Sequence, residues 1–179
     1  MGDPAPAGGP TQDEVMAVSL FKMGIRHGDS VLDCGCGTGK VAIAAARVAK
    51  MVYAVDRRPE AIRYARQEAA AAGVTNIEFF CGEAREFLSG NRIFDCAFVG
   101  GTKEIDEILP LLAQKVKRTI VVNVVMVGTL SRVVETMLRL GIFREAVHVQ
   151  VSRSKPIAGS IMFRPIDPVS IVVGSGTAC

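Results

Sequence analysis

Short apolar runs alternate with longer segments whose apolar side chains recur every three to four positions, from residue 31 to residue 141. The short runs are VLDCG, MVYAVD, NIEFFCG, IFDCAFVGG and TIVVNVVMV. The segments of the second kind are KVAIAAARVAK, PEAIRYARQEAAAAG, the short EAREFLS, EIDEILPLLAQKVK and LSRVVETMLRLG. The first kind has the length of buried strands and the second has the period of helices. This alternation predicts an α/β fold, with a parallel sheet covered by helices on both faces.

The helical period also predicts which side chains face the sheet. In the fourth helical segment these are Ile105, Ile108, Leu109, Leu112 and Val116. In the fifth they are Leu130, Val133, Val134, Met137 and Leu138. Because such stripes are the part of a helix that packs on a core, we expect all ten side chains to be buried.

The pattern changes after residue 141. REAVHVQVSRS and PVSIVVG have the composition of strands, but no helical period separates them. A short connection permits only an antiparallel pair, so we predict a mostly parallel sheet of seven strands that closes with an antiparallel hairpin. Before the first strand, residues 12–23 have helical spacing, and Thr11 with Glu14 predicts a capping box. We therefore expect a flexible tail over residues 1–10, one domain over 11–174 and a second tail over 175–179.

Composition limits the classes of function. The 179 residues fit one domain, and no apolar run approaches the ~18 residues of a membrane span or resembles a signal peptide. A net charge of +3, with 6% aromatic residues and no Trp, argues against a nucleic-acid partner. None of the five cysteines forms the CxxC pairs of a zinc ribbon. We expect a cytoplasmic protein with reduced thiols, no bound metal and no membrane partner.

The stretch DCGCGTG, residues 33–39, carries the first chemical signal. Its glycines, Gly35, Gly37 and Gly39, allow a sharp turn and close approach of the backbone to a ligand. The spacing differs from the G-x-G-x-x-G of dinucleotide-binding folds, and no Gly lies where a Walker loop needs one. With Asp33 two residues ahead, the stretch resembles the first motif of S-adenosylmethionine-dependent methyltransferases, in which Asp33 would face the amino-acid end of the cofactor. Its neighbours Cys36 and Thr38 belong to the same predicted cofactor site.

Two further acids lie at the ends of the next two predicted strands. Asp56 ends MVYAVD, where a carboxylate can accept both ribose hydroxyls of an adenosine. Gly82, Glu83 and Ala84 follow the third strand and resemble the G-D-A of the methyltransferase fold. There the acid receives the adenine amino group, and Glu83 stands where Asp is usual. Three successive strand ends thus predict one site for an adenosine with a zwitterionic tail.

The whole pattern resembles the decarboxylating precorrin carbon-15 methyltransferase family of cobalamin biosynthesis, over about residues 9–174. The resemblance rests on GGPTQDEV, LDCGCGTGKVAIAAA, VYAVDRRPEAI, CGEARE, FVGGTKEIDEIL and GSIMFRPIDPVSIVVG. The chain departs from the family at Gln12, where Lys is frequent, and at Met16, where Arg is frequent. These departures concern substrate contacts more than the fold.

The resemblance implies a class I methyltransferase that uses S-adenosylmethionine and assembles as a homotetramer. Its reaction methylates carbon 15 of a precorrin, with or without cobalt, and removes the carboxyl group of the ring C acetate. Thr11 would form part of a lid over the cofactor. Gly100 and Gly101, in VGGTK, replace the N/D-P-P-Y of enzymes that methylate exocyclic amines of bases. Lys103, Arg153 and Arg164 are candidate partners for substrate carboxylates, and no catalytic residue is assigned.

Two other classes of function remain open at this point. One is a different class I methyltransferase, acting on tRNA adenine or a small metabolite. The other is a subunit that binds S-adenosylmethionine without turnover. The mild charge and the absence of an added RNA-binding domain count against tRNA. Intact Asp33, Asp56 and glycines count against loss of catalysis.

Overall fold

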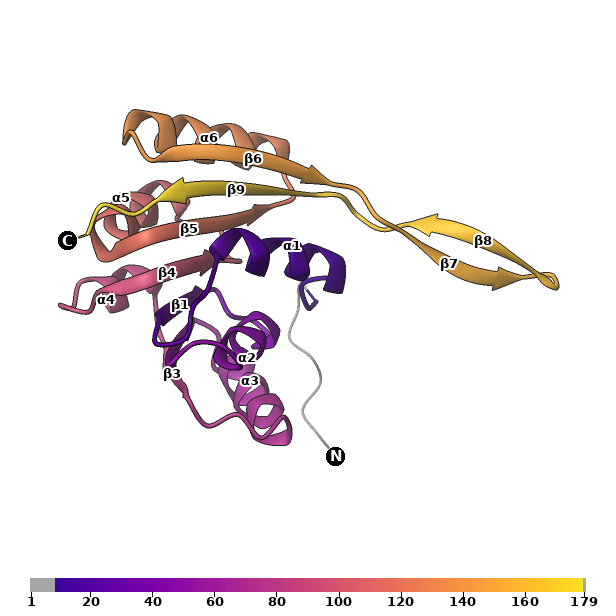
Figure 1. The fold of residues 1–179 in the computed structure, drawn as a ribbon, viewed down its shortest axis with the longest axis horizontal. Coiled ribbons are helices and arrows are strands. Elements are labelled where there is room, and N and C mark those ends of the chain that lie inside the picture. The colour runs from indigo at the N-terminus through magenta and orange to yellow at the C-terminus, as the bar shows by residue number, and fades with distance from the viewer. Residues whose placement is uncertain (1–8, 179) are drawn as a thin grey trace.

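A seven-stranded sheet forms the centre of the molecule in the computed structural model, which describes residues 9–178 (Figure 1). Its strand order is β3-β2-β1-β4-β5-β9-β6. The strands are β1 (Ser30–Cys34), β2 (Met51–Asp56), β3 (Ile77–Cys81), β4 (Phe94–Val99), β5 (Val116–Val124), β6 (Phe143–Val149) and β9 (Val169–Ser175). The first five pair in parallel, and β9 is antiparallel to both β5 and β6. The predicted fold class is therefore confirmed, with the chain order reversing between β1 and β4.

In the described part of the chain, six helices cover the two faces of the sheet. They are α1 (Asp13–Met23), α2 (Lys40–Ala46), α3 (Pro59–Ala71), α4 (Ala84–Leu88), α5 (Ile105–Lys115) and α6 (Val127–Arg139). α1, α2 and α3 pack together on one face, and α4, α5 and α6 pack on the other, so each face has its own apolar cluster. No helix among residues 9–178 is long and apolar enough to cross a membrane.

The predicted inward faces are largely confirmed. All five side chains predicted in and after α5 are buried, and so are Val133 and Met137 of α6. Leu130 and Val134 are partly buried against the same core. Leu138 is 58% exposed, so its prediction as an inward residue was wrong. It follows Met137 by one helical position, about 100° around the axis, which turns it away from the sheet.

A second, two-stranded sheet projects from the body as an arm (Figure 1). It consists of β7 (Ser152–Ile157) and β8 (Ser160–Pro165), antiparallel and exposed along their whole length. Ala158 and Gly159 connect them with φ angles of 45° and 76°, the positive angles of a tight hairpin turn. The sequence pattern predicted one strand running to residue 154 and none over 155–165, so the arm was missed.

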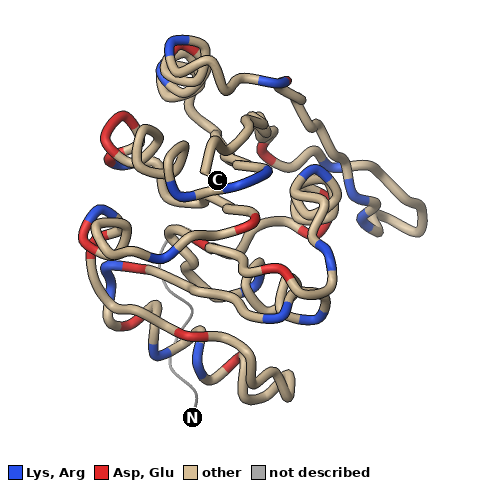
Figure 2. Tube along the Cα trace, turned by 60° about the vertical axis from the view of Figure 1, so that its left-hand side comes forward, with Lys and Arg blue, Asp and Glu red and all other residues tan. Residues whose placement is uncertain are grey.

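The arm has two chemically different faces. Cross-strand partners share a face, which places Arg153 opposite Arg164 and Lys155 opposite Met162. The other face carries Phe163 opposite Ser154 and Ile161 opposite Pro156. Both Phe163 and Ile161 are 69% exposed. Figure 2 shows Lys and Arg along this arm, which contains no Asp or Glu between residues 152 and 165.

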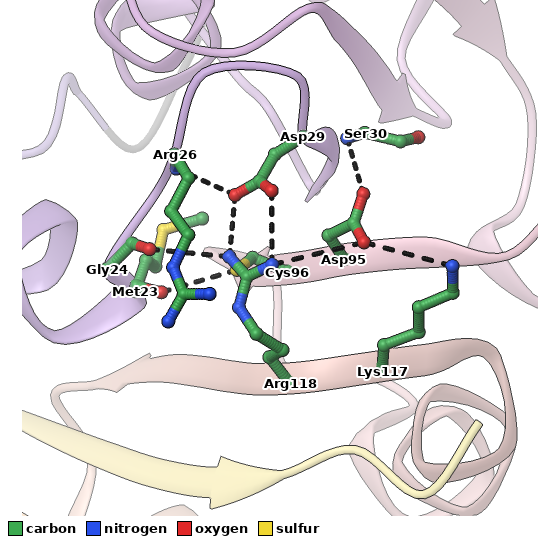
Figure 3. A network of polar contacts seen from close by, with 9 residues as sticks. All are labelled: Met23, Gly24, Arg26, Asp29, Ser30, Asp95, Cys96, Lys117 and Arg118. Carbon is green, nitrogen blue, oxygen red and sulfur yellow. Dashed lines mark hydrogen bonds and ion pairs between the residues drawn. The ribbon is translucent and has the colours of Figure 1, made fainter. Parts of the chain in front are cut away.

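A polar network joins the amino ends of β1, β4 and β5, at the opposite edge from the predicted cofactor motifs (Figure 3). Arg118 donates to both carboxylate oxygens of Asp29 at 3.0 and 2.6 Å, and its Nη2 lies 3.2 Å from the Cys96 sulfur. Asp95 accepts the Ser30 amide at 2.8 Å. Although burial opposes ionisation, hydrogen bonds from Arg118 hold the pKa of Asp29 below its ordinary value. The network fixes the turn that leads into β1, and sequence reading did not foresee it.

The two ends of the domain differ from the sequence expectations. The N-cap of α1 is Gln12, without a side-chain bond, so the capping box predicted from Thr11 and Glu14 was wrong. Glu14 instead pairs with Arg153 of the arm. Residues 176–178, assigned to a tail, donate backbone hydrogen bonds to Arg118, Ala113 and Val116. Of the N-terminal tail over 1–10, residues 1–8 lie outside the described residues.

Candidate cofactor-binding site

The glycine loop between β1 and α2 is fastened to the end of β2. The Gly35 and Cys36 amides donate to the Val55 carbonyl at 2.8 and 3.0 Å. The Gly37 amide donates to Oδ2 of Asp56 at 2.9 Å. The first predicted motif and the acid of the second strand are therefore parts of one structure, and the Asp56 carboxylate sets the position of the loop.

Two of the glycines are required by close packing. A Cβ on Gly35 would lie 2.6 Å from the Gly101 nitrogen, and one on Gly39 would lie 2.8 Å from the Ala65 Cβ. Both glycines also have φ near +76°, which disfavours any side chain. The Gly100 amide donates to the Cys34 carbonyl at 2.9 Å. The loops after β1 and β4 thus touch through backbone, which leaves open space above them.

Asp33 lies beneath the glycine loop and is 1% exposed. Neither carboxylate oxygen has a hydrogen-bond partner among the described residues, although the Ala42 amide faces it from α2. Burial raises the pKa of Asp33 to about 7, and the Ala42 amide offsets only part of this rise. An acid held in this way lacks the compensation that buried carboxylates normally receive. Its unsatisfied oxygens fit a site that is completed by a cationic ligand.

The neighbouring thiols are buried as well. Burial raises the pKa of Cys34 to about 12 and also raises that of Cys36. Both groups are therefore neutral near pH 7 and act as small apolar side chains. Among residues 9–178, no group of three or more His, Cys, Asp or Glu side chains is arranged to hold a metal ion.

Asp56 is 5% exposed and holds its neighbour Arg58. The Arg58 Nε and Nη2 atoms donate to Oδ1 and Oδ2 of Asp56, each at 3.0 Å. The Arg58 amide also donates to Oδ1 at 3.0 Å. Burial opposes ionisation, but the hydrogen bonds from Arg58 and Gly37 hold the pKa of Asp56 below its ordinary value. Asp56 is therefore ionised at neutral pH.

A cavity of about 240 Å³ opens beside these groups, at the carboxyl ends of β1, β2 and β4. The residues predicted from sequence that line it are Gly35, Asp56, Glu83, Ala84, Gly100, Gly101 and Lys103. Those that do not line it are Thr11, Asp33, Cys36, Gly37, Thr38, Gly39, Arg153 and Arg164. The structure thus brings Gly35 of the glycine loop, the acids at the ends of β2 and β3 and the glycine pair after β4 around one opening, while Asp33 and the rest of the glycine loop lie outside it.

Thr38 instead lines a neighbouring cavity of about 410 Å³, between the start of α1, α2 and α3. Lys40 connects this region to the beginning of α1. Its Nζ donates to the Thr11 carbonyl at 2.8 Å and pairs with Asp13 at 2.6 Å. Thr11 is therefore attached at the end of the glycine loop, although its side chain does not line the smaller cavity.

The arm brings its cations back toward α1. Arg153 donates from Nε and Nη2 to the two Glu14 oxygens at 2.9 and 2.5 Å. The hydrogen bond from Arg153 lowers the pKa of Glu14 to about 2. Because Arg164 is the cross-strand partner of Arg153, the two guanidinium groups extend from the same face of the arm.

Among the residues that sequence reasoning missed, Arg58 and Lys40 make the side-chain bonds that hold this region together. Arg and Lys side chains are usually exposed to solvent, so neither residue stood out in the sequence. Only the three-dimensional placement of β2 and α1 against the glycine loop reveals their partners. The nearest signal in the sequence was the spacing of Asp56 and Arg58, two residues apart.

A family profile described as a precorrin methyltransferase domain matches residues 6–174. A Methanosarcina acetivorans protein, named probable cobalt-precorrin-6B C(15)-methyltransferase (decarboxylating), is 51% identical over 177 residues, 96% of each chain. A Methanocaldococcus jannaschii protein of the same name is 32% identical and covers 90% of this chain and 88% of its own.

Solved structures agree with these sequence matches. The crystal structure of a precorrin-8W decarboxylase from Methanobacterium thermoautotrophicum superposes with a TM-score of 0.90 at 29% identity, covering 95% of this chain and 92% of that one. A Thermotoga maritima S-adenosylmethionine-dependent O-methyltransferase, at 15% identity and a TM-score of 0.77, covers 95% of this chain and 67% of that one and shares the fold. The family resemblance read from the sequence is confirmed: the chain belongs to the precorrin methyltransferase family, whose methyl donor is S-adenosylmethionine.

Proposed function

We propose that the chain methylates carbon 15 of precorrin-6B, or of its cobalt form, and promotes decarboxylation of the ring C acetate. The observation that carries this proposal is the 51% identical relative of that name, which matches almost end to end. The cavity beside Gly100 and Gly101 supports it, because it joins the cofactor motifs to a loop without bulky side chains.

The residues around the loop fit S-adenosylmethionine, which supplies an electrophilic methyl group when bound. Asp33 offers a buried carboxylate without a partner, suited to a cationic group. The backbone of Gly35 and Gly37 forms the turn, and Cys36, Thr38 and Gly39 complete it. Asp56 would hold the ribose, while Glu83 and the Ala84 amide would hold adenine. Thr11, attached through Lys40, would close over this end of the site.

The chain would act mainly by orientation. Gly100 and Gly101 form a low floor against which a flat macrocycle can lie, because they contact Gly35 through backbone alone. Correct placement of two reactants can lower a barrier by ~7–11 kcal/mol. The conjugated macrocycle can accept the electrons released by decarboxylation, so the chain need not supply a nucleophile. Lys103 lines the opening and offers a cation to a substrate carboxylate.

Arg153 and Arg164 would supply further cations from the arm. Arg153 is engaged by Glu14, so its contribution would be to hold the arm against α1 as well as to attract carboxylates. Arg164 extends from the same face. A tetrapyrrole with several carboxylates fits this arrangement better than a neutral acceptor does.

The test is mass spectrometry of the product after incubation with S-adenosylmethionine and precorrin-6B or its cobalt form. The expected product has gained one methyl group and lost one molecule of carbon dioxide. A methylated product that keeps every carboxylate would refute the decarboxylation. Methylation of tRNA or a small metabolite, without reaction of either macrocycle, would refute the assignment. Gly101→Val tests the floor: we expect turnover to fall while cofactor affinity and melting temperature are retained.

We also propose that the chain works in the cytoplasm as a homotetramer. Phe163 and Ile161 support self-association, because they form an apolar face on a projecting arm that the body of the chain does not cover. Light scattering after size-exclusion chromatography should give the mass of four chains. Phe163→Glu should lower that mass, and Met162→Glu, on the opposite face, is the control. A wild-type monomer would refute the proposal.

A further inference from the structure

We propose that Arg58 is a gate on the ribose subsite, which must leave Asp56 before the cofactor can bind there. This inference rests on the proposed role of Asp56 as the ribose acceptor. It adds a residue that controls access to this acceptor, at a position where sequence motifs gave no role.

The hydrogen-bonding capacity of Asp56 is already used. A carboxylate offers about four lone-pair positions. Oδ1 accepts the Arg58 amide and Nε, each at 3.0 Å. Oδ2 accepts the Gly37 amide at 2.9 Å and Arg58 Nη2 at 3.0 Å. Two ribose hydroxyls therefore have no position on Asp56 until existing bonds are given up.

Only the side-chain bonds can be given up without changing the fold. The amide bonds from Gly37 and Arg58 hold the glycine loop and the start of α3 in place. The guanidinium, in contrast, belongs to a flexible side chain that is 33% exposed. Its rotation toward solvent leaves the buried Asp56 carboxylate with only the two amide bonds, so opening costs free energy that a bound ribose would recover.

The guanidinium also occupies space that the cofactor needs. Asp56 and Arg58 both line the cavity that holds the predicted motifs. Arg58 Nη2 lies 3.8 Å from the position that a Cβ on Gly37 would take, so the group extends over the glycine loop. The gate thus blocks both the acceptor atoms and the approach to the loop. Apparent affinity is reduced by the fraction of molecules in which Arg58 stays closed.

The gate is tested by calorimetry with S-adenosylhomocysteine, whose ammonium and carboxylate charges cancel. With this probe, removal of a cation does not by itself favour binding. We expect Arg58→Ala to bind it roughly tenfold more tightly than wild type, with the gain in the association rate measured by surface plasmon resonance. Arg58→Gln, a polar replacement, should show the same direction and guards against a folding defect in the first variant.

Arg66→Ala is the matched control. It removes one cation from α3, the helix that begins directly after Arg58, but Arg66 does not line the cavity. We expect its affinity to stay within about twofold of wild type, because no ion pair with Asp56 is lost. An equal gain in Arg66→Ala would show a general charge effect and would overturn the gate.

Asp56→Asn separates the gate from the proposed site. This variant should bind the probe more weakly than wild type, and adding Arg58→Ala to it should bring no further gain. If Asp56→Asn weakens binding but Arg58→Ala brings no gain, the gate is refuted and the ribose role of Asp56 stands. If Asp56→Asn binds like wild type, the ribose role of Asp56 is refuted, and the gate with it.

Discussion

Replacing Asp33 with Asn tests the electrostatics of the buried acid beneath the glycine loop. In the unfolded chain this carboxyl loses its proton near its ordinary pKa of 3.8, whereas in the folded protein burial raises its pKa to about 7. Folding therefore takes up a proton between these two pH values. The stability associated with neutral Asp33 is complete below pH 3.8 and is lost as the pH rises through 7.

The size of the effect follows from the two pKa values. Each unit of difference is worth 1.36 kcal/mol, so a rise from 3.8 to about 7 corresponds to about 4 kcal/mol. Asn has a similar shape and does not ionise. The quantity to follow is the free energy of unfolding of Asp33→Asn minus that of wild type. This difference should be about 4 kcal/mol larger at pH 8 than at pH 4.

Urea titrations at half-unit steps from pH 4 to pH 9, for both proteins, measure this difference. The difference curve should rise between pH 4 and pH 7 and then level off. Parallel curves for wild type and Asp33→Asn would refute the reasoning, because they would show that Asp33 ionises in the folded protein at its ordinary pKa. Calorimetry at pH 8, where Asp33 is ionised in the wild type, should in addition show weaker binding of S-adenosylmethionine by the variant, since it lacks the negative charge beneath the loop.

Three further predictions concern the stability of separate parts of the fold. Arg118→Met should lower the free energy of unfolding, measured in urea at pH 7, by about 3 kcal/mol, because it leaves Asp29 charged and without its ion-pair partner. This loss should shrink as the pH falls through the pKa of Asp29, below 3.8. Ala158→Asn should slow amide exchange in the arm, since Asn tolerates positive φ better than Ala; unchanged exchange would contradict this. Gly39→Ala should lower the melting temperature more than Gly73→Ala, because both have positive φ but only Gly39 packs against α3; equal losses would contradict the packing argument.

The sheet could be predicted from the sequence because its signals are local. The strands of the parallel part contain short, mostly apolar runs, which are typical of buried parallel strands. The antiparallel closure followed from the missing helix between β6 and β9. The arm had no such signal, because its strands are exposed on both faces and Pro156 interrupts the pattern.

The candidate site was predictable to the extent that it consists of strand ends. Glycine spacing and the acids at the ends of β1, β2 and β3 indicated where the cavity would be, since parallel strands end at one edge. The sequence did not show that Asp33 lies beneath the loop, outside the cavity, because burial depends on how α2 packs. It also did not show the bonds of Arg58, since a guanidinium can reach many partners from one position.

The placement of β9 has a consequence for how the chain folds. This strand is the last one in the sequence, yet it lies inside the sheet, between β5 and β6, and pairs with both of them. During synthesis the edge of β5 stays open until residues 169–175 leave the ribosome, and an open apolar edge invites pairing with other chains. Premature termination just before β9 would therefore yield an aggregating product rather than a smaller enzyme.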